Sequence, residues 1–232
     1  MLSFTPIFIP GQLCTEFLFA KQRAALPQSG QIADTRHHSS ITEMARAALH
    51  QCTGPLLPIG LSMGGYVALE MARLSPERMA GMALLSTTVG HDTEARRNER
   101  RQVIKLAAHD GFQGITRHGL SQLISAASYA DDVLVDSILA MAADVGRAGF
   151  IRQQTAIMGR RDQSDTLGRF TAPVLILCGT SDMLTPPSLS IEMAHLAAVS
   201  TLRLIDGVGH LSSLEAPEAV TAALQDFFCQ IS

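Results

Sequence analysis

A serine between glycines is the first residue whose setting could support chemistry. Ser62 lies in Gly60–Gly65 (Gly-Leu-Ser-Met-Gly-Gly), which ends a strand-like run over Pro55–Gly60 and leads into a helical pattern over Met63–Leu74. This is the setting of a nucleophile elbow, a tight strand-to-helix turn that exposes the serine hydroxyl. The free amides and the dipole of the helix N-terminus favour an oxyanion nearby. An ordinary Gly-Ser turn is the alternative, but the flanking elements favour Ser62 as a nucleophile.

A serine hydroxyl needs a base that removes its proton. The candidate base is His210, on a flexible Gly-rich loop that follows a predicted strand over Thr201–Ile205. The candidate acid that orients its imidazole is Asp182, which follows the strongest predicted strand, Pro173–Cys178. Open α/β sheets place their sites at the carboxyl ends of the strands. We therefore expect the serine, the histidine and the acid to meet at one edge of a sheet.

The elements that would position these residues alternate between two hydrophobic periods. Further strand-like runs cover Pro6–Pro10, Ile32–Asp34 and Met79–Leu85, and further helical patterns cover Ser40–Cys52, Ser188–Ala198 and Pro217–Phe228. Ser40 and Glu43 fit a capping box at the start of the first of these helices. Such alternation is typical of an α/β fold with a parallel sheet and helices on both faces. With 232 residues, 47% of them apolar, we expect a single domain over residues 1–232.

The alternation stops between about residues 90 and 168. No strand-like run occurs there, and breaks near Gly111, Ser128–Asp131 and Gly146 separate four helical stretches. Inserted between two strands at the active edge, this segment is expected to form a helical lid over the pocket. We expect it to influence substrate choice, and the core to fold without it.

Composition and charge exclude several classes of protein. The formal net charge is −3, with 18 Lys and Arg against 21 Asp and Glu, which argues against a nucleic-acid binder. No apolar run reaches the roughly 18 residues that span a membrane. The first ten residues lack the positive charge of a secretory signal. Four scattered cysteines without a Cys-x-x-Cys pair favour a reduced, cytoplasmic protein.

Together the motifs resemble the α/β-hydrolase superfamily, in its small, lid-bearing branch of esterases, lactonases and carbon–carbon bond hydrolases. The resemblance covers essentially the whole chain, with the order Ser…Asp…His of that family. It implies the α/β-hydrolase fold, with a mainly parallel sheet of six strands because the chain begins later than the family's fullest form. It also implies an oxyanion hole from the backbone amides of Met63 and of Gln12, with Leu13 as the alternative to Gln12. The usual His-Gly of that loop is Pro10-Gly11 here.

The expected function is that of a serine hydrolase that cleaves a small carboxylic ester through an acyl-enzyme. His210 would act as the base and Asp182 would orient it. No metal or organic cofactor is required. The same triad could instead open a lactone, or cleave an amide or a carbon–carbon bond, and a small-molecule receptor with little turnover is an alternative of another class. The sequence leaves the oligomeric state open.

Other residues compete for these roles. Asp206 could orient His210, but a turn role before its two glycines is favoured. Cys14 is interpreted as a partly buried thiol, and His37-His38 as part of a structural loop. Asp92 and Asp162 are expected to be solvated or to cap helices.

A run of positive charge lies near the start of the predicted insertion. It places five cations within ten residues, namely Arg96, Arg97, Arg100, Arg101 and Lys105. The run could attract an anionic substrate. Because Glu94 and Glu99 are interleaved with it, a solvated helix face is favoured.

Overall fold

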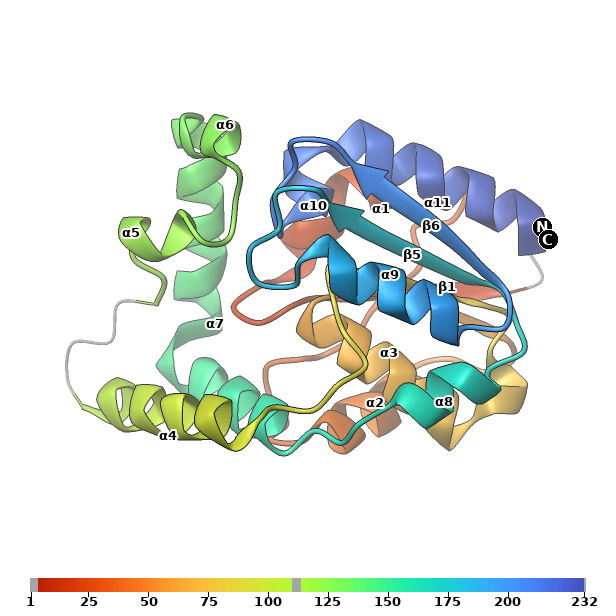
Figure 1. Ribbon diagram of the computed structural model, residues 1–232, viewed down its shortest axis with the longest axis horizontal. Coiled ribbons are helices and arrows are strands. Elements are labelled where there is room, and N and C mark those ends of the chain that lie inside the picture. Colours follow the sequence, from red (N-terminus) through yellow and green to blue (C-terminus); the bar gives the residue numbers. More distant parts are fainter. Residues whose placement is uncertain (1–3, 110–113, 232) are drawn as a thin grey trace.

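Six strands form one sheet at the centre of the molecule (Figure 1). The computed structural model describes residues 4–109 and 114–231. In chain order the strands are β1 (Thr5–Ile9), β2 (Gln31–Ile32), β3 (Leu56–Leu61), β4 (Met82–Leu85), β5 (Val174–Gly179) and β6 (Ser200–Ile205). They pair in the order β2-β1-β3-β4-β5-β6, and every pair is parallel. The predicted parallel sheet of six strands is therefore confirmed, and all carboxyl ends meet at one edge.

The central strands are apolar on both faces because both faces are covered. Every residue of β3, β4 and β5 is buried, which is characteristic of an interior parallel strand. One row of paired residues runs across the sheet through Phe8, Ile59, Ala83 and Leu175. Strand β6 lies at the edge and is partly exposed.

Helices form a layer on each face of the sheet (Figure 1). One layer contains α2 (Ile41–His50), α3 (Met63–Leu74), α8 (Ser164–Arg169) and α9 (Pro187–Leu196). The other contains the 3-10 helix η1 (Glu16–Phe19), α1 (Ala20–Ala25) and α11 (Pro217–Ile231). Two short helices complete the core, η2 (Pro76–Arg78) and α10 (Ser212–Glu215). Ser40 Oγ accepts the amide of Glu43 at 3.1 Å, so the predicted capping serine begins α2.

Between β4 and β5 the described residues form helices and no strand. These helices are α4 (Glu94–Ala108), α5 (Arg117–Leu120), α6 (Ala126–Tyr129), α7 (Asp132–Met158) and α8. Figure 1 shows α5, α6 and α7 beyond the arrowheads of β5 and β6. The predicted break near Gly111 lies outside the described residues, whereas that at Ser128–Asp131 separates α6 from α7. Gly146 interrupts α7 with φ +66°, a left-handed conformation that glycine adopts without a Cβ clash.

The inserted helices share the apolar core with the sheet. Leu120, Ile138 and Met141 pack in the same cluster as Leu177 and the residues of α11. Ile157 at the end of α7 joins the cluster that surrounds α3. This sharing argues against the expectation that the core folds without the insertion, because removing the helices would expose apolar surface that the core buries.

The turn between β3 and α3 depends on one very close approach of two backbones. A Cβ at Gly64 would overlap the carbonyl oxygen of Ile9 in β1. That oxygen belongs to the backbone of a central strand, so it cannot move aside as a flexible side chain would. Glycine at this position therefore allows the first turn of α3 to lie against the end of β1.

We predict that Gly64→Ala lowers the free energy of unfolding by more than about 4 kcal/mol, because the overlap forces α3 away from β1. The matched control is Gly90→Ala, whose added Cβ would have its nearest neighbour at 3.9 Å. It should change stability by no more than about 1 kcal/mol. Urea unfolding followed by circular dichroism measures both, and equal effects of the two substitutions would contradict the predicted overlap.

Candidate active site

Ser62 occupies a strained turn at the N-terminus of α3. Its φ of 56° and ψ of −115° are unusual for a residue with a side chain, and such conformations cost about 1–3 kcal/mol. Its neighbours hold the turn in place. The Ser62 amide donates to Leu85 O at 2.9 Å, and its carbonyl accepts from the Gly65 amide at 2.9 Å and from Thr87 Oγ1 at 2.8 Å. These bonds offset the strain and leave the side chain facing a cavity.

His210 and Asp182 form a buried pair. His210 Nδ1 lies 3.0 Å from Asp182 Oδ1 and 2.9 Å from Oδ2, and both residues are at most 4% exposed. The carboxylate also accepts the amides of Leu184 and Thr185, each at 2.9 Å, and the Thr185 hydroxyl at 2.7 Å. These donors fix the orientation of the carboxylate. With Nδ1 engaged, the ring presents Nε2 to the cavity.

The charge state of Asp182 suits this arrangement. Burial by itself would raise the pKa of the carboxyl. The hydrogen bond and charge of His210, together with the donors of Thr185, outweigh burial and hold the pKa of Asp182 below its ordinary value. The group is therefore ionised at neutral pH.

Hydrogen bonds from two of its backbone amides hold the loop that carries His210. The His210 amide donates to Leu123 O at 2.9 Å, and the Gly209 amide donates to Glu215 Oε2 at 3.1 Å. Leu123 belongs to the segment between α5 and α6, so the insertion fixes this loop. The glycines suggested flexibility from the sequence. In the structure Gly209 allows tight packing instead, since a Cβ at this position would lie 2.6 Å from the Ser125 amide nitrogen.

The loop after β1 passes over Ser62, as the expected oxyanion hole requires. A Cβ at Gly11 would lie 3.5 Å from Ser62 Cβ. The amide of Leu13 donates to Gln153 Oε1 at 2.9 Å and is already satisfied. Within residues 4–109 and 114–231, the amides of Gln12 and Met63 have no acceptor. The geometry therefore favours Gln12 over Leu13 as the donor of this loop.

Gln153 of α7 is a positioning residue that sequence reasoning missed. It is fully buried, accepts the Leu13 amide and donates through Nε2 to Thr35 O at 3.1 Å. It therefore ties the loop after β1 to the loop after β2. The only signal in the sequence is a glutamine on the buried side of a helix, and that signal does not identify its partners.

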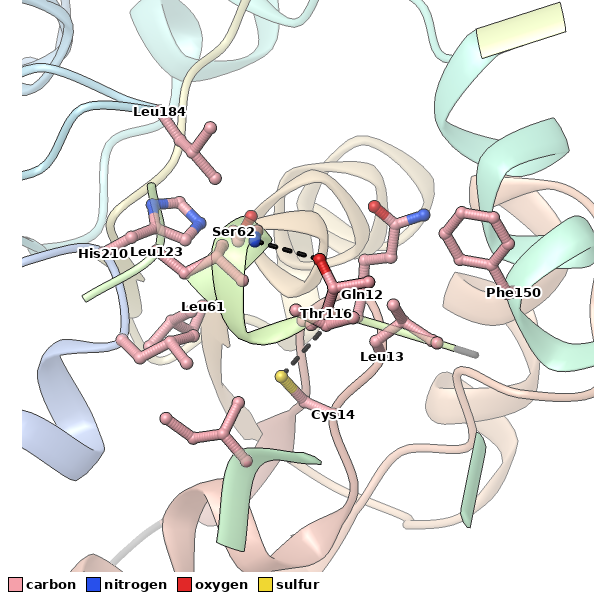
Figure 2. Close-up of a pocket in the computed structure, with 16 residues that line it drawn as sticks. Gln12, Leu13, Cys14, Leu61, Ser62, Thr116, Leu123, Phe150, Leu184 and His210 are labelled. Carbon is pink, nitrogen blue, oxygen red and sulfur yellow. Dashed lines mark hydrogen bonds between the residues drawn. The ribbon is translucent and has the colours of Figure 1, made fainter. Parts of the chain in front are cut away.

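Ser62 and His210 line two cavities. The apolar compartment, about 340 Å³, is lined largely by Leu13, Ile115, Leu123, Ile138, Phe150 and Leu211. Figure 2 shows Ser62 and His210 on one side of it, Gln12 and Leu13 beside them, and Phe150 opposite. The polar compartment, about 290 Å³, lies under α4 and is lined largely by Tyr66, Arg96, Glu99, Arg100, Gln154 and Thr185. Gln12 and Leu184 also contribute to both compartments.

The competing candidates lie apart from the Ser62–His210 pair or lack the required reactivity. Asp206 accepts the Thr180 hydroxyl at 3.1 Å in an exposed turn. His37 pairs with Asp34 at 2.8 Å and is exposed. Cys14 is buried and contributes to the apolar compartment, but burial raises the pKa of its thiol to about 12. A thiol with that pKa is a weak nucleophile at neutral pH.

The prediction that Asp92 is solvated or caps a helix is wrong. Its carboxylate is 5% exposed and contacts Arg100 at 2.5 Å and Arg160 at 2.7 Å. Two guanidinium groups compensate its burial, which no local pattern could indicate. Asp162 is instead exposed, as expected of a solvated residue, and accepts the Ser164 amide at 2.9 Å just before α8.

Two features are absent from the part of the chain that the structure describes. It contains no cluster of three or more His, Cys, Asp or Glu side chains that could hold a metal ion. None of its helices combines the length and apolar character needed to cross a membrane.

Comparisons with known proteins identify the family. The sequence model described as the Alpha/beta hydrolase family matches residues 19–223. The chain therefore belongs to the alpha/beta hydrolase family and is a hydrolase.

Individual relatives are distant in sequence. A Mycobacterium tuberculosis protein that carries the name of a non-heme bromoperoxidase, BpoC, is 27% identical over 187 residues, covering 76% of this chain and 69% of the relative. A pimeloyl-acyl-carrier-protein methyl ester esterase of Edwardsiella ictaluri is 23% identical over 193 residues, covering 81% and 75%. The solved structure of a thermophilic esterase from Thermogutta terrifontis has a TM-score of 0.92 at 24% identity, covering 99% of this chain and 91% of that one.

We predict that Gln153→Met lowers kcat for p-nitrophenyl acetate about 10- to 100-fold with little change in KM. Without its acceptor the loop after β1 shifts, and a small misplacement of donors affects the reaction step more than binding. The matched control is Gln122→Met, an exposed residue of the same insertion. A purely structural role for Gln153 would lower thermal stability while leaving kcat of the folded enzyme unchanged, and that result would contradict the prediction.

Proposed function

We propose that this protein is a serine hydrolase that cleaves small carboxylic esters, with Ser62 as nucleophile, His210 as base and Asp182 as the orienting acid. The observation that carries the proposal is that the strained Ser62 turn shares its cavity with a histidine whose Nδ1 is held by a buried carboxylate. A relative named as a methyl ester esterase supports an ester as the substrate.

The proposed mechanism uses only groups of this chain. His210 Nε2 removes the proton of the Ser62 hydroxyl as its oxygen attacks the ester carbonyl. The amides of Gln12 and Met63 meet the resulting oxyanion, and each such donor lowers the barrier by roughly 3–4 kcal/mol. His210 then protonates the departing alcohol. In the second half, His210 activates water to attack the acyl-enzyme and release the acid.

The inserted helices act in this proposal as a lid that selects the substrate. The inserted segment contributes Ile115, Ile138 and Phe150 to the apolar compartment, and Arg96 and Arg100 to the polar one. Contacts of this kind surround the parts of the substrate that do not react and exclude water from the acyl-enzyme.

We predict that Ser62→Ala abolishes labelling by a fluorophosphonate and lowers the turnover of p-nitrophenyl esters by several orders of magnitude, because no other described group provides the attacking oxygen. Mass spectrometry of the labelled protein identifies the modified residue. Persistent labelling of the variant, or labelling of Cys14, would refute the assignment of Ser62.

We predict that Asp182→Asn lowers kcat far more than Asp206→Asn, on the scale of the roughly 10⁴-fold loss known for a triad aspartate changed to asparagine. Asparagine at position 182 no longer stabilises the charged imidazole, whereas the side chain of Asp206 has Thr180 as its hydrogen-bond partner among the described residues. Steady-state kinetics of the two variants test the assignment. Similar losses in both, or a greater loss at position 206, would mean that the acid is misplaced.

A further inference from the structure

The polar compartment is charged in a way that a plain alkyl ester would not require. We propose that it binds a free carboxylate of the substrate, so that the preferred substrate is an ester with an apolar portion on one side of the reacting carbonyl and a carboxylate on the other. This inference rests on the proposed function and specifies its substrate class.

The polar compartment lies beside Ser62, where it can receive one end of a bound ester. Ser62 and His210 line both cavities, so an ester whose carbonyl lies at Ser62 can extend in two directions. One direction offers mostly apolar side chains and no charged Arg, Lys, Asp or Glu among the lining residues. The other offers the guanidinium groups of Arg96 and Arg100, which lie one turn apart on α4 and face the same space.

The charge balance around the polar compartment carries the second step. Arg100 donates to Asp92 at 2.5 Å and to Gln154 Oε1 at 2.7 Å, and Asp92 also contacts Arg160 at 2.7 Å. The lining further contains the pair of Arg96 and Glu99 at 2.8 Å. Among the side chains that line the compartment, the two guanidinium groups of Arg96 and Arg100 stand against one carboxylate, that of Glu99. The excess of one positive charge matches a substrate with one negative charge.

The exposure of the Arg96–Glu99 pair carries the third step. The two side chains are 54% and 61% exposed, and ion pairs in such contact with solvent contribute about 0–1 kcal/mol. A substrate carboxylate can therefore replace Glu99 as the partner of Arg96 at little cost. Arg100 is held by its buried partners and serves as the fixed part of the site.

The side-chain amide of Gln12 is an unpartnered donor between the two compartments. Gln12 Nε2 is buried and has no hydrogen-bond partner among the described residues. Gln12 lines both compartments beside Ser62. A buried amide donor without a partner is unfavourable by about 1–3 kcal/mol in the free enzyme, and an oxygen of the substrate between the compartments would satisfy it.

The test compares monomethyl adipate, which carries a carboxylate, with dimethyl adipate, which has the same chain without the charge. We expect the wild-type protein to have the higher kcat/KM for the monoester. Arg96→Gln should lower kcat/KM for monomethyl adipate about tenfold, the effect of losing one charged hydrogen bond in partial contact with solvent. It should leave dimethyl adipate nearly unchanged.

Two further variants sharpen the comparison. Glu99→Gln removes the carboxylate that competes with the substrate, so it should raise kcat/KM for the monoester alone. Arg101→Gln is the matched control, because Arg101 lies on the same helix, pairs with Glu94 and is not part of the compartment. An equal effect of Arg96→Gln on both esters, or a loss of monoester activity in Glu99→Gln, would overturn the proposal.

Binding of the monoester to a variant that lacks the proposed nucleophile tests the carboxylate site independently of the proposed function. Titration of Ser62→Ala with monomethyl adipate in a calorimeter should show saturable binding that the added substitution Arg96→Gln weakens about tenfold. If the monoester binds in this way but the wild-type protein turns over neither ester, the proposed function fails and the carboxylate site stands. If both esters are hydrolysed equally and the monoester does not bind more tightly than the diester, the carboxylate site fails and the proposed function stands.

Discussion

The close approach of helix α3 to strand β1 is the constraint on which the rest of the site depends. Gly64 lets the first turn of the helix lie against the carbonyl of Ile9. That contact fixes where the turn at Ser62 stands relative to the loop after β1. Because Gln12 lies in this loop and Met63 begins the helix, the same contact sets the distance between the two amides proposed for the oxyanion hole. If α3 lay slightly farther from β1, each element would remain intact, but the two amides would be too far apart to bind the same oxyanion.

The inserted helices are part of this assembly rather than a cover added above it. The carbonyl of Leu123 accepts the amide of His210, and the side chain of Gln153 accepts the amide of Leu13. One bond steadies the loop of the proposed base and the other the loop of the proposed oxyanion hole. The sheet brings the two loops to one edge, and these hydrogen bonds from the insertion hold them in position there.

The sequence predicted those parts that depend on local pattern. The parallel sheet was predicted from the alternating periods, and its six strands from the resemblance to the α/β-hydrolases. Ser62, Asp182 and His210 were proposed as site residues because each lies just beyond the end of a predicted strand. The structure brings Asp182 and His210 into contact and places Ser62 and His210 around the same cavities.

What the sequence did not predict depends on contacts between distant segments. Gln153 meets a residue 140 positions away, and no local spacing encodes such a pair. The choice between Gln12 and Leu13 depended on that contact. Asp92 was expected to be solvated or to cap a helix because its partner Arg160 lies far along the chain. The cationic run was judged a solvated face, since only the packed helix shows that Arg96 and Arg100 line a cavity with Ser62.

The two hydrogen bonds from the insertion also limit how such enzymes can be recombined. A chimera that takes its helical segment from a relative would break the chain after β4 and before β5. If the incoming segment had no glutamine at the place of Gln153 and no carbonyl at the place of Leu123, two buried amides would lose their acceptors. Successful crossovers should therefore be those that transfer these acceptors together with the pocket walls. In this fold, the inserted segment should therefore be exchanged only together with the groups that accept the amides of Leu13 and His210.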